Sequence, residues 1–214
     1  MPVSSRSGRN EAVLIALLFV GGLGYILPWA AAASSALTFS AYDLAEWTSL
    51  IPGVRHGAEP MAAPGQLRAV LIVFTLLIAL LPRRRRSAAG ALSAAAALAL
   101  VIAQLPPLEY FMDAGFHADV NYGQQFTFSV LSLIGAALCW MVPRGTPRTI
   151  ALVLTGAIGS VAAITAAMRG MEALAGLAVG FSLGVGPWIT AASIGGLALV
   201  TLRSYRRAES NGAP

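Results

Sequence analysis

The sequence predicts an all-α, polytopic integral membrane protein with six transmembrane helices and short amphipathic helices in its outer loops. Its composition is the first reason, because 57% of the 214 residues are hydrophobic and 11% are charged, whereas about a quarter of a soluble domain is charged. The second reason is that the chain has six separate apolar stretches. The third is that arginine is concentrated in alternate loops between them. These features exclude a water-soluble single domain and a disordered chain.

A membrane-spanning helix needs roughly 20 predominantly apolar residues. We assign six spans to residues 12–33, 67–81, 88–105, 126–142, 150–168 and 187–202. Together they form a transmembrane domain over residues 12–203, between an N-terminal segment (1–11) and a C-terminal tail (204–214). The second span is short, and we expect Arg68 at its start to extend its guanidinium to the membrane interface.

Two segments leave alternatives open. Arg6 and Arg9 precede the first apolar stretch and the small residues 30–33 end it, so a cleaved secretory signal peptide is the alternative to a first span. Residues 173–185 are apolar but too few to add a span, and we interpret them as an interfacial or re-entrant segment.

The charges predict the orientation of the six spans. Eleven of the fourteen arginines fall on the side that holds both termini, and seven of the nine acidic residues fall on the other side. The arginines of the first group are Arg6, Arg9, Arg83, Arg84, Arg85, Arg86, Arg144, Arg148, Arg203, Arg206 and Arg207. Since short cytoplasmic loops attract arginine, we expect a bacterial inner-membrane protein with both termini in the cytoplasm. The basic loops should contact anionic lipids and not nucleic acid.

The outer loops are long, and the first is predicted to contain a short helix near residues 41–50. Ser40 or Asp43 could cap this helix, and Pro52 would end it. Aromatic residues near the predicted span ends are typical of anchors at the membrane interface. The predicted anchors are Trp29, Tyr42, Trp47, Tyr110 and Trp188.

The second outer loop offers a candidate metal site. Asp113 and His117 are four residues apart, so a helix would place them on one face, and Asp119 follows closely. Carboxylate and imidazole groups suit a borderline divalent cation. The alternative is a solvated acidic loop with an incidental histidine.

Gly176, Gly180 and Gly184 repeat every four residues and predict a small-residue face for close helix packing. Residues 180–184 also match G-x-S-x-G, but they lack the strand-to-helix context that a nucleophilic serine requires. Helices this rich in alanine and glycine are expected to leave little cavity between them.

The centres of the six predicted spans contain no Asp, Glu, Arg or His. This pattern disfavours haem b, which needs axial ligands, and disfavours proton coupling through buried carboxylates. A quinone, a carotenoid or a chlorophyll-type pigment stays compatible with the sequence. The leading functional prediction is a non-catalytic accessory or structural subunit that packs on other membrane protein subunits and lipids. The alternatives are a small transporter component for an apolar or neutral solute and a membrane enzyme that uses the outer Asp/His cluster.

Overall fold

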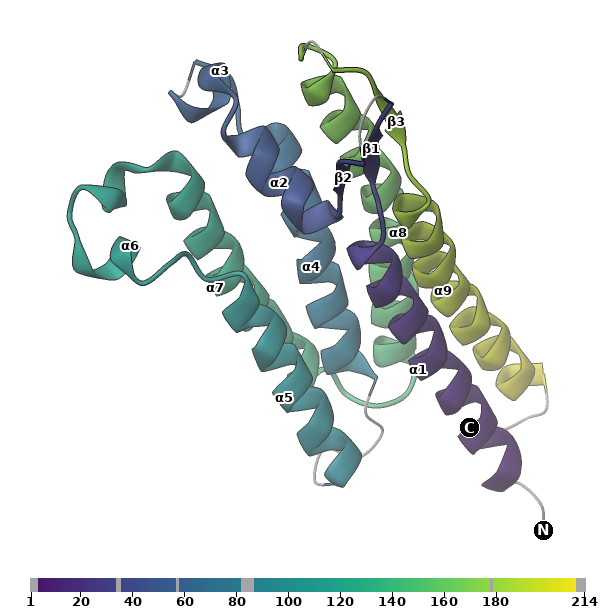
Figure 1. Cartoon of the computed structure of the whole chain (residues 1–214). Helices are drawn as coiled ribbons and strands as arrows, with labels where there is room; N and C mark the ends of the chain where they lie inside the picture. The colour runs from purple at the N-terminus through teal and green to yellow at the C-terminus, as the bar shows by residue number, and fades with distance from the viewer. Residues whose placement is uncertain (1–3, 34–35, 57, 82–86, 178, 211–214) are drawn as a thin grey trace.

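The computed structural model describes residues 4–33, 36–56, 58–81, 87–177 and 179–210, and these residues are mostly helical (Figure 1). The predicted all-α class is therefore confirmed. Each predicted span overlaps one long helix. The long helices are α1 (Ser4–Ile26), α4 (Ala62–Leu80), α5 (Ala88–Ala103), α7 (Val120–Met141), α8 (Thr146–Leu174) and α9 (Gly186–Ser210).

Three helices in the described part of the chain are long and apolar enough to cross a membrane, namely α4, α7 and α8. The apolar helical segments Asn10–Ile26 and Ala88–Ala103 are shorter. The last turns of α9 carry Arg203, Arg206 and Arg207, which make that helix more polar. By length and composition, the structure thus supports three spans and not the six predicted. Arg83–Arg86, which contribute to the predicted orientation, lie outside the described residues.

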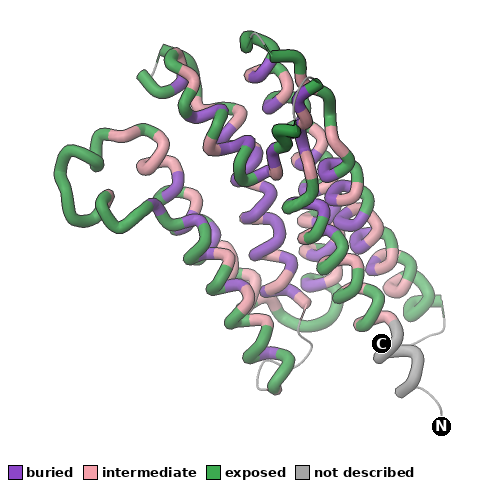
Figure 2. Tube along the Cα trace, viewed as in Figure 1, coloured by how far each residue is buried: buried purple, intermediate pink, exposed green. Residues whose placement is uncertain are grey.

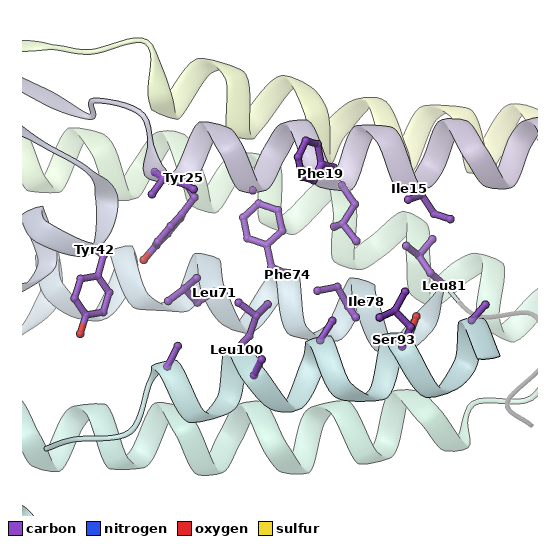
Figure 3. A pocket seen from close by; sticks show the side chains of 18 of the residues that line it. Ile15, Phe19, Tyr25, Tyr42, Leu71, Phe74, Ile78, Leu81, Ser93 and Leu100 are labelled. Carbon is purple, nitrogen blue, oxygen red and sulfur yellow. The ribbon is translucent and has the colours of Figure 1, made fainter. Parts of the chain in front are cut away.

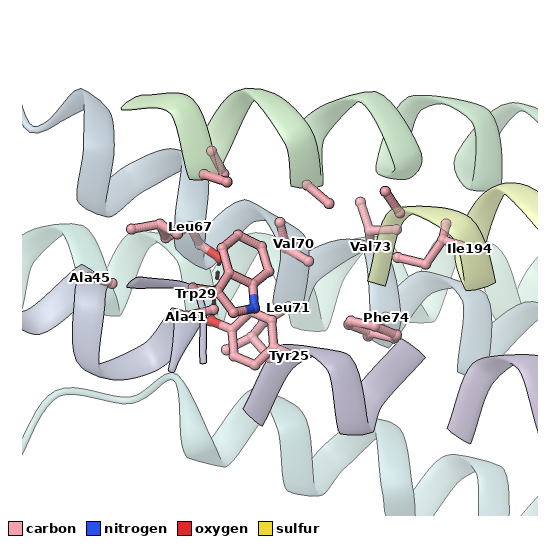
Figure 4. Close-up of a cluster of buried hydrophobic side chains, with 14 of the residues drawn as sticks. Tyr25, Trp29, Ala41, Ala45, Leu67, Val70, Leu71, Val73, Phe74 and Ile194 are labelled. Carbon is pink, nitrogen blue, oxygen red and sulfur yellow. Dashed lines mark hydrogen bonds between the residues drawn. The ribbon is translucent and has the colours of Figure 1, made fainter. Parts of the chain in front are cut away.

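Helix α4 is the centre of the molecule, because α2, α5, α7 and α8 all pack against it. Buried positions accordingly follow α4 and the sides of its neighbours that face it (Figure 2). Leu67, Leu77 and Leu80 of α4 are fully buried. Figure 4 shows the part of this core where Tyr25 donates a hydrogen bond to the carbonyl oxygen of Leu67, 3.3 Å away.

The first apolar stretch does not stay helical to residue 33. Helix α1 ends at Ile26, and strand β1 (Ala30–Ala32) follows Pro28. Proline has no N–H to donate and disfavours a helical conformation in the residue before it. The N–H of Trp29 instead binds the carbonyl oxygen of Phe39, which belongs to strand β2 (Thr38–Phe39).

Strand β1 lies in the middle of a small antiparallel sheet of order β2-β1-β3, in which β3 is Phe181–Leu183. Ala30 pairs with Phe39 on one side and with Leu183 on the other. Because β1 follows α1 and β3 precedes α9, the sheet joins the ends of two helices that also pack along their lengths. Within the segment predicted to be interfacial or re-entrant, residues 173 and 174 end α8 and residues 181–183 form the edge strand β3.

The predicted helix-packing face of Gly176, Gly180 and Gly184 is wrong, because none of these glycines lies in a helix. A Cβ atom at Gly184 would overlap the backbone of Pro28, whereas one at Gly176 would meet no atom within 4 Å. Spacing along an apolar run cannot separate a helix from a strand when the run is this short.

Close helix packing through small residues occurs elsewhere, where α8 meets α4 and α9. A Cβ atom at Gly156 would lie 2.9 Å from the Cβ of Ala198, and one at Gly159 would overlap Val73. These contacts let the backbones of α8 and α9 approach closely.

The predicted helix of the first loop is present as α2 (Ala41–Ser49). It begins with a capping box in which the Ser40 hydroxyl accepts from the N–H of Asp43 and the Asp43 carboxylate accepts from the N–H of Ser40. Its buried face includes Leu44 and Thr48, and α3 (Pro52–Arg55) follows it directly.

The connection from α5 to α7 contains α6 (Glu109–Met112) and the 3-10 helix η1 (Phe116–Ala118), and it projects from the body of the molecule (Figure 1). Aromatic contacts hold it to the start of α7. The Tyr110 ring lies 5.8 Å from the ring of Phe126, and the Phe116 ring lies 6.0 Å from the ring of Tyr122.

Candidate functional site

The predicted metal site is not formed. Among the described residues, no three His, Cys, Asp or Glu side chains gather where they could hold a metal ion. Asp113 accepts from the N–H of Gly115 at 2.8 Å, and Asp119 caps α7 by accepting from the N–H of Asn121 at 2.9 Å. The His117 ring packs against Tyr110, with 5.2 Å between ring centroids. The carboxylates thus satisfy backbone donors at a turn and at a helix start.

One of the five predicted interface anchors is wrong. Trp29 is fully buried, and its indole N–H donates to the carbonyl oxygen of Gly24 at 3.0 Å. Tyr42, Trp47 and Trp188 keep between 44% and 55% of their surface exposed. Tyr110 is of intermediate exposure. For these four, anchoring in a membrane stays a prediction.

Arg68 is the centre of a polar network that joins α2, α4 and α7. We call it the Glu46–Arg68 network, and it contains Glu46, Arg68, Asn121, Gln124 and Gln125. The Nη2 atom of Arg68 lies 2.7 Å from Oε1 of Glu46 and 2.6 Å from Oδ1 of Asn121, while Nη1 donates to Oε1 of Gln124 at 2.8 Å. Nε2 of Gln125 donates to the same Glu46 oxygen at 2.8 Å.

The expected extension of Arg68 to an interface is wrong. Only 3% of its side-chain surface is exposed, against 32% for Glu46. A buried guanidinium is costly unless it is paired and hydrogen-bonded. The first turns of α7 meet this requirement because Asn121 and Gln124 are three residues apart and so share one helical face.

Tyr42 lies on α2, one turn before Glu46. The pKa of the Tyr42 phenol is raised above its ordinary value of 10.0, mainly by partial burial and to a smaller extent by the negative charge of Glu46. Arg68 acts in the opposite direction but does not cancel these effects. The Tyr42 hydroxyl therefore stays protonated at neutral pH and can donate a hydrogen bond.

A long apolar groove runs between α1 and α5, with α4 at its base (Figure 3). Its volume is about 790 Å³, which contradicts the expectation of little cavity between the helices. We call it the α1–α5 groove. It is lined by Glu11, Ile15, Leu18, Phe19, Gly22, Tyr25, Ile26, Tyr42, Leu71, Phe74, Ile78, Leu81, Ala89, Leu92, Ser93, Ala96, Ala99, Leu100 and Ala103.

The groove exists because α1 and α5 each pack mainly on other helices. Helix α1 packs along α9, and α5 packs on α4 and α7. The side of α5 that faces the groove carries small alanine side chains at residues 89, 96, 99 and 103, which leave space beside the helix. Figure 3 shows Tyr25 and Tyr42 at one end of the groove and Ile15, Leu81 and Ser93 towards the other end.

The groove adjoins the Glu46–Arg68 network. A small pocket of about 10 Å³ is lined by Tyr42, Glu46, Arg68, Leu71, Ala103, Gln104 and Gln125. Tyr42, Leu71 and Ala103 line both this pocket and the groove. A mostly apolar groove with a few polar groups beside it is a common form of binding site for a small ligand.

Sequence reasoning missed both parts of this site. The sequence does contain a signal for the polar network. Arg68 lies at the start of an apolar stretch and therefore needs polar partners. Asn121, Gln124 and Gln125 have the spacing of one helical face and could provide them. The predicted fourth span begins at residue 126, so these residues fall in the predicted loop before it. The groove had no such signal, since it depends on how two helices that are distant in sequence are held apart.

In the comparisons with known proteins, no family model, no curated protein and no solved structure matches the chain.

Proposed function

We propose that this chain is a multi-pass membrane protein that binds a long-chain, apolar or uncharged molecule in the α1–α5 groove. The observation that carries the proposal is that an apolar groove of about 790 Å³ and a small pocket beside the Glu46–Arg68 pair share three lining residues, Tyr42, Leu71 and Ala103. Such a site would accept the tail of an amphiphile in the groove and its head in the small pocket. Volumes of about 300–1,000 Å³ are typical of ligand sites.

The exposed surfaces of the helices support a membrane setting. On α8, Ile158 and Val161 keep 64% and 65% of their surface exposed, and Leu138 of α7 keeps 61%. Apolar surface of this extent is rare on a soluble monomer. We infer that all six long helices cross a bacterial inner membrane, with both termini in the cytoplasm, since Arg144 and the arginines of α9 would then lie on the cytoplasmic side.

The groove favours the transporter or carrier prediction over the other two. Helices α1 and α5 would face lipid on their outer sides, so a hydrophobic solute could enter sideways from the bilayer. A quinone, a carotenoid or another long-chain molecule has the required shape. The enzyme alternative depended on the Asp113/His117/Asp119 cluster, which is not formed, and we do not propose it. Packing on other membrane protein subunits stays a prediction.

The test is to identify what copurifies with the protein from its own membrane. Ala96 lines the groove on α5, so Ala96→Trp would fill it, whereas Leu98 of the same helix is 52% exposed and does not line it. We expect a long-chain molecule in extracts of the wild type and of Leu98→Trp, identified by mass spectrometry, and its loss from Ala96→Trp. Equal amounts in all three proteins would contradict the proposal.

A further inference from the structure

We infer that the small pocket selects a ligand whose head is a single uncharged hydroxyl or carbonyl group. This inference rests on the proposed function, because it concerns the head of the molecule whose tail occupies the α1–α5 groove. It names the chemical class of the ligand as a long-chain alcohol or ketone, and it excludes fatty acids, phospholipids and long-chain amines.

The size of the pocket is the first argument. Its volume is about 10 Å³, which is close to the space that one water molecule occupies in such a cavity. One oxygen atom fits there, but a phosphate group, with its four oxygens, is too large. The pocket is lined by residues of α2, α4 and α7 and by Ala103 and Gln104 at the end of α5, and these elements pack together around it.

Charge is the second argument. The Glu46 carboxylate and the Arg68 guanidinium lie 2.7 Å apart and compensate each other. An anionic head would meet the Glu46 carboxylate, while Asp43 adds a second negative charge one turn earlier on α2. A cationic head would meet the buried Arg68 guanidinium. Placing an uncompensated charge beside an ion pair whose guanidinium is buried is costly, whereas an uncharged group avoids this cost.

Hydrogen bonding is the third argument. Tyr42, Gln104 and Gln125 line the pocket together with the ion pair. The Gln104 amide donates to the carbonyl oxygen of Leu100 at 3.0 Å, and its Oε1 accepts from Ser132 at 3.2 Å, so its orientation is fixed. A phenol hydroxyl and amide groups can bind either a hydroxyl or a carbonyl oxygen. Because Gln104 and Gln125 already donate to Leu100 and Glu46, their amides are held in place, and a head with one oxygen atom can use their remaining hydrogen-bonding capacity.

The experiment compares three probes that share one tail and differ in their head. Hexadecanol, palmitate and hexadecylamine are each added at neutral pH to delipidated wild-type protein in detergent, and bound probe is counted by native mass spectrometry. We expect hexadecanol to bind about tenfold more tightly than either charged probe, in line with the cost of an unpaired charge. Equal or tighter binding of palmitate or hexadecylamine would overturn the inference.

A charge variant gives a second, independent readout. Glu46→Gln removes the negative charge and leaves Arg68 uncompensated, so palmitate binding should rise and the preference for hexadecanol should shrink or reverse. Glu172→Gln is the control, because Glu172 pairs with Arg169 at an exposed position of α8. We expect that variant to keep the wild-type preference. An unchanged preference in folded Glu46→Gln protein would contradict the role assigned to the ion pair.

The groove variant separates this inference from the proposed function. If Ala96→Trp loses hexadecanol while Leu98→Trp keeps it, the groove binds the tail. The comparison of hexadecanol with palmitate and hexadecylamine then tests the head selectivity by itself. If hexadecanol and palmitate bind equally and Ala96→Trp loses both, the groove function stands and the head selectivity fails. If no probe depends on Ala96, the proposed function itself fails.

Discussion

At the scale of single residues, Arg68 explains why α2 lies where it does. Its guanidinium is 3% exposed and donates to side chains of α2 and α7 at once. A buried arginine with one partner removed leaves the other charge uncompensated, which costs about 3–5 kcal/mol. The network therefore fixes the arrangement of three elements around the small pocket.

We expect Arg68→Ala to lower the free energy of unfolding by about 3 kcal/mol, at the lower end of that range because Glu46 is one-third exposed. Arg169→Ala is the matched control, since it removes an exposed i,i+3 pair with Glu172 and should cost less than about 1 kcal/mol. Thermal denaturation in detergent measures both. Similar losses in the two variants would show that Arg68 is not a structural centre.

At the scale of elements, the small sheet joins the two helices that begin and end the bundle. Strands β1 and β3 pair directly, and the N–H of Gly184 donates to the carbonyl oxygen of Trp29 at 2.9 Å. Two residues further on, the N–H of Gly186 donates to the carbonyl oxygen of Pro28 at 2.9 Å. This contact leaves no space for a side chain at Gly184.

Gly184→Ala should therefore destabilise the protein by about 1–3 kcal/mol, the usual cost of overpacking. Gly176→Ala should change stability by less than about 0.5 kcal/mol, because its Cβ would meet nothing within 4 Å. The comparison is informative because the sequence pattern alone assigns both glycines to one packing face. Melting temperatures of the two variants measure it, and equal temperatures would favour that pattern over the sheet.

The sequence predicted those elements whose signal is local. Ser40 and Asp43 form the expected cap of α2, and long apolar runs correspond to long helices. It did not predict β1 and β3, because strands of three residues in alanine- and glycine-rich segments have no distinct period. The burial of Trp29 and the partners of Arg68 also depend on contacts between distant parts of the chain, which residue spacing does not reveal.

At the scale of the whole molecule, the ends of the bundle differ in character. Helices α2 and α3, the sheet and α6 gather at one end, and the start of α1 and the end of α9 lie at the other (Figure 1). The Glu46–Arg68 network lies at the first end, so an amphiphile in the groove would hold its head there and its tail towards the end that holds the termini.

The proposed orientation predicts the side on which each loop lies. Reporter fusions after Arg148 and Arg207 should report the cytoplasm, and fusions after Glu59 and Asp119 should report the outside. A protein in which α4, α7 and α8 alone cross the membrane would place the N-terminal and C-terminal ends on opposite sides. A cytoplasmic reporter after Asp119 would contradict the six-span arrangement.

The most direct test of the central claim is to find where a bound tail lies. Hexadecanol with a photoreactive group in its tail is bound to the purified protein, activated by light, and located by sequencing labelled peptides. The groove predicts labels on its lining in α1 and α5, near Phe19, Leu92 and Ala96, and their loss in Ala96→Trp. Labels spread evenly over the exposed faces of α7 and α8, at residues such as Leu138 and Ile158, would mean that the protein binds the tail only as it binds bulk lipid.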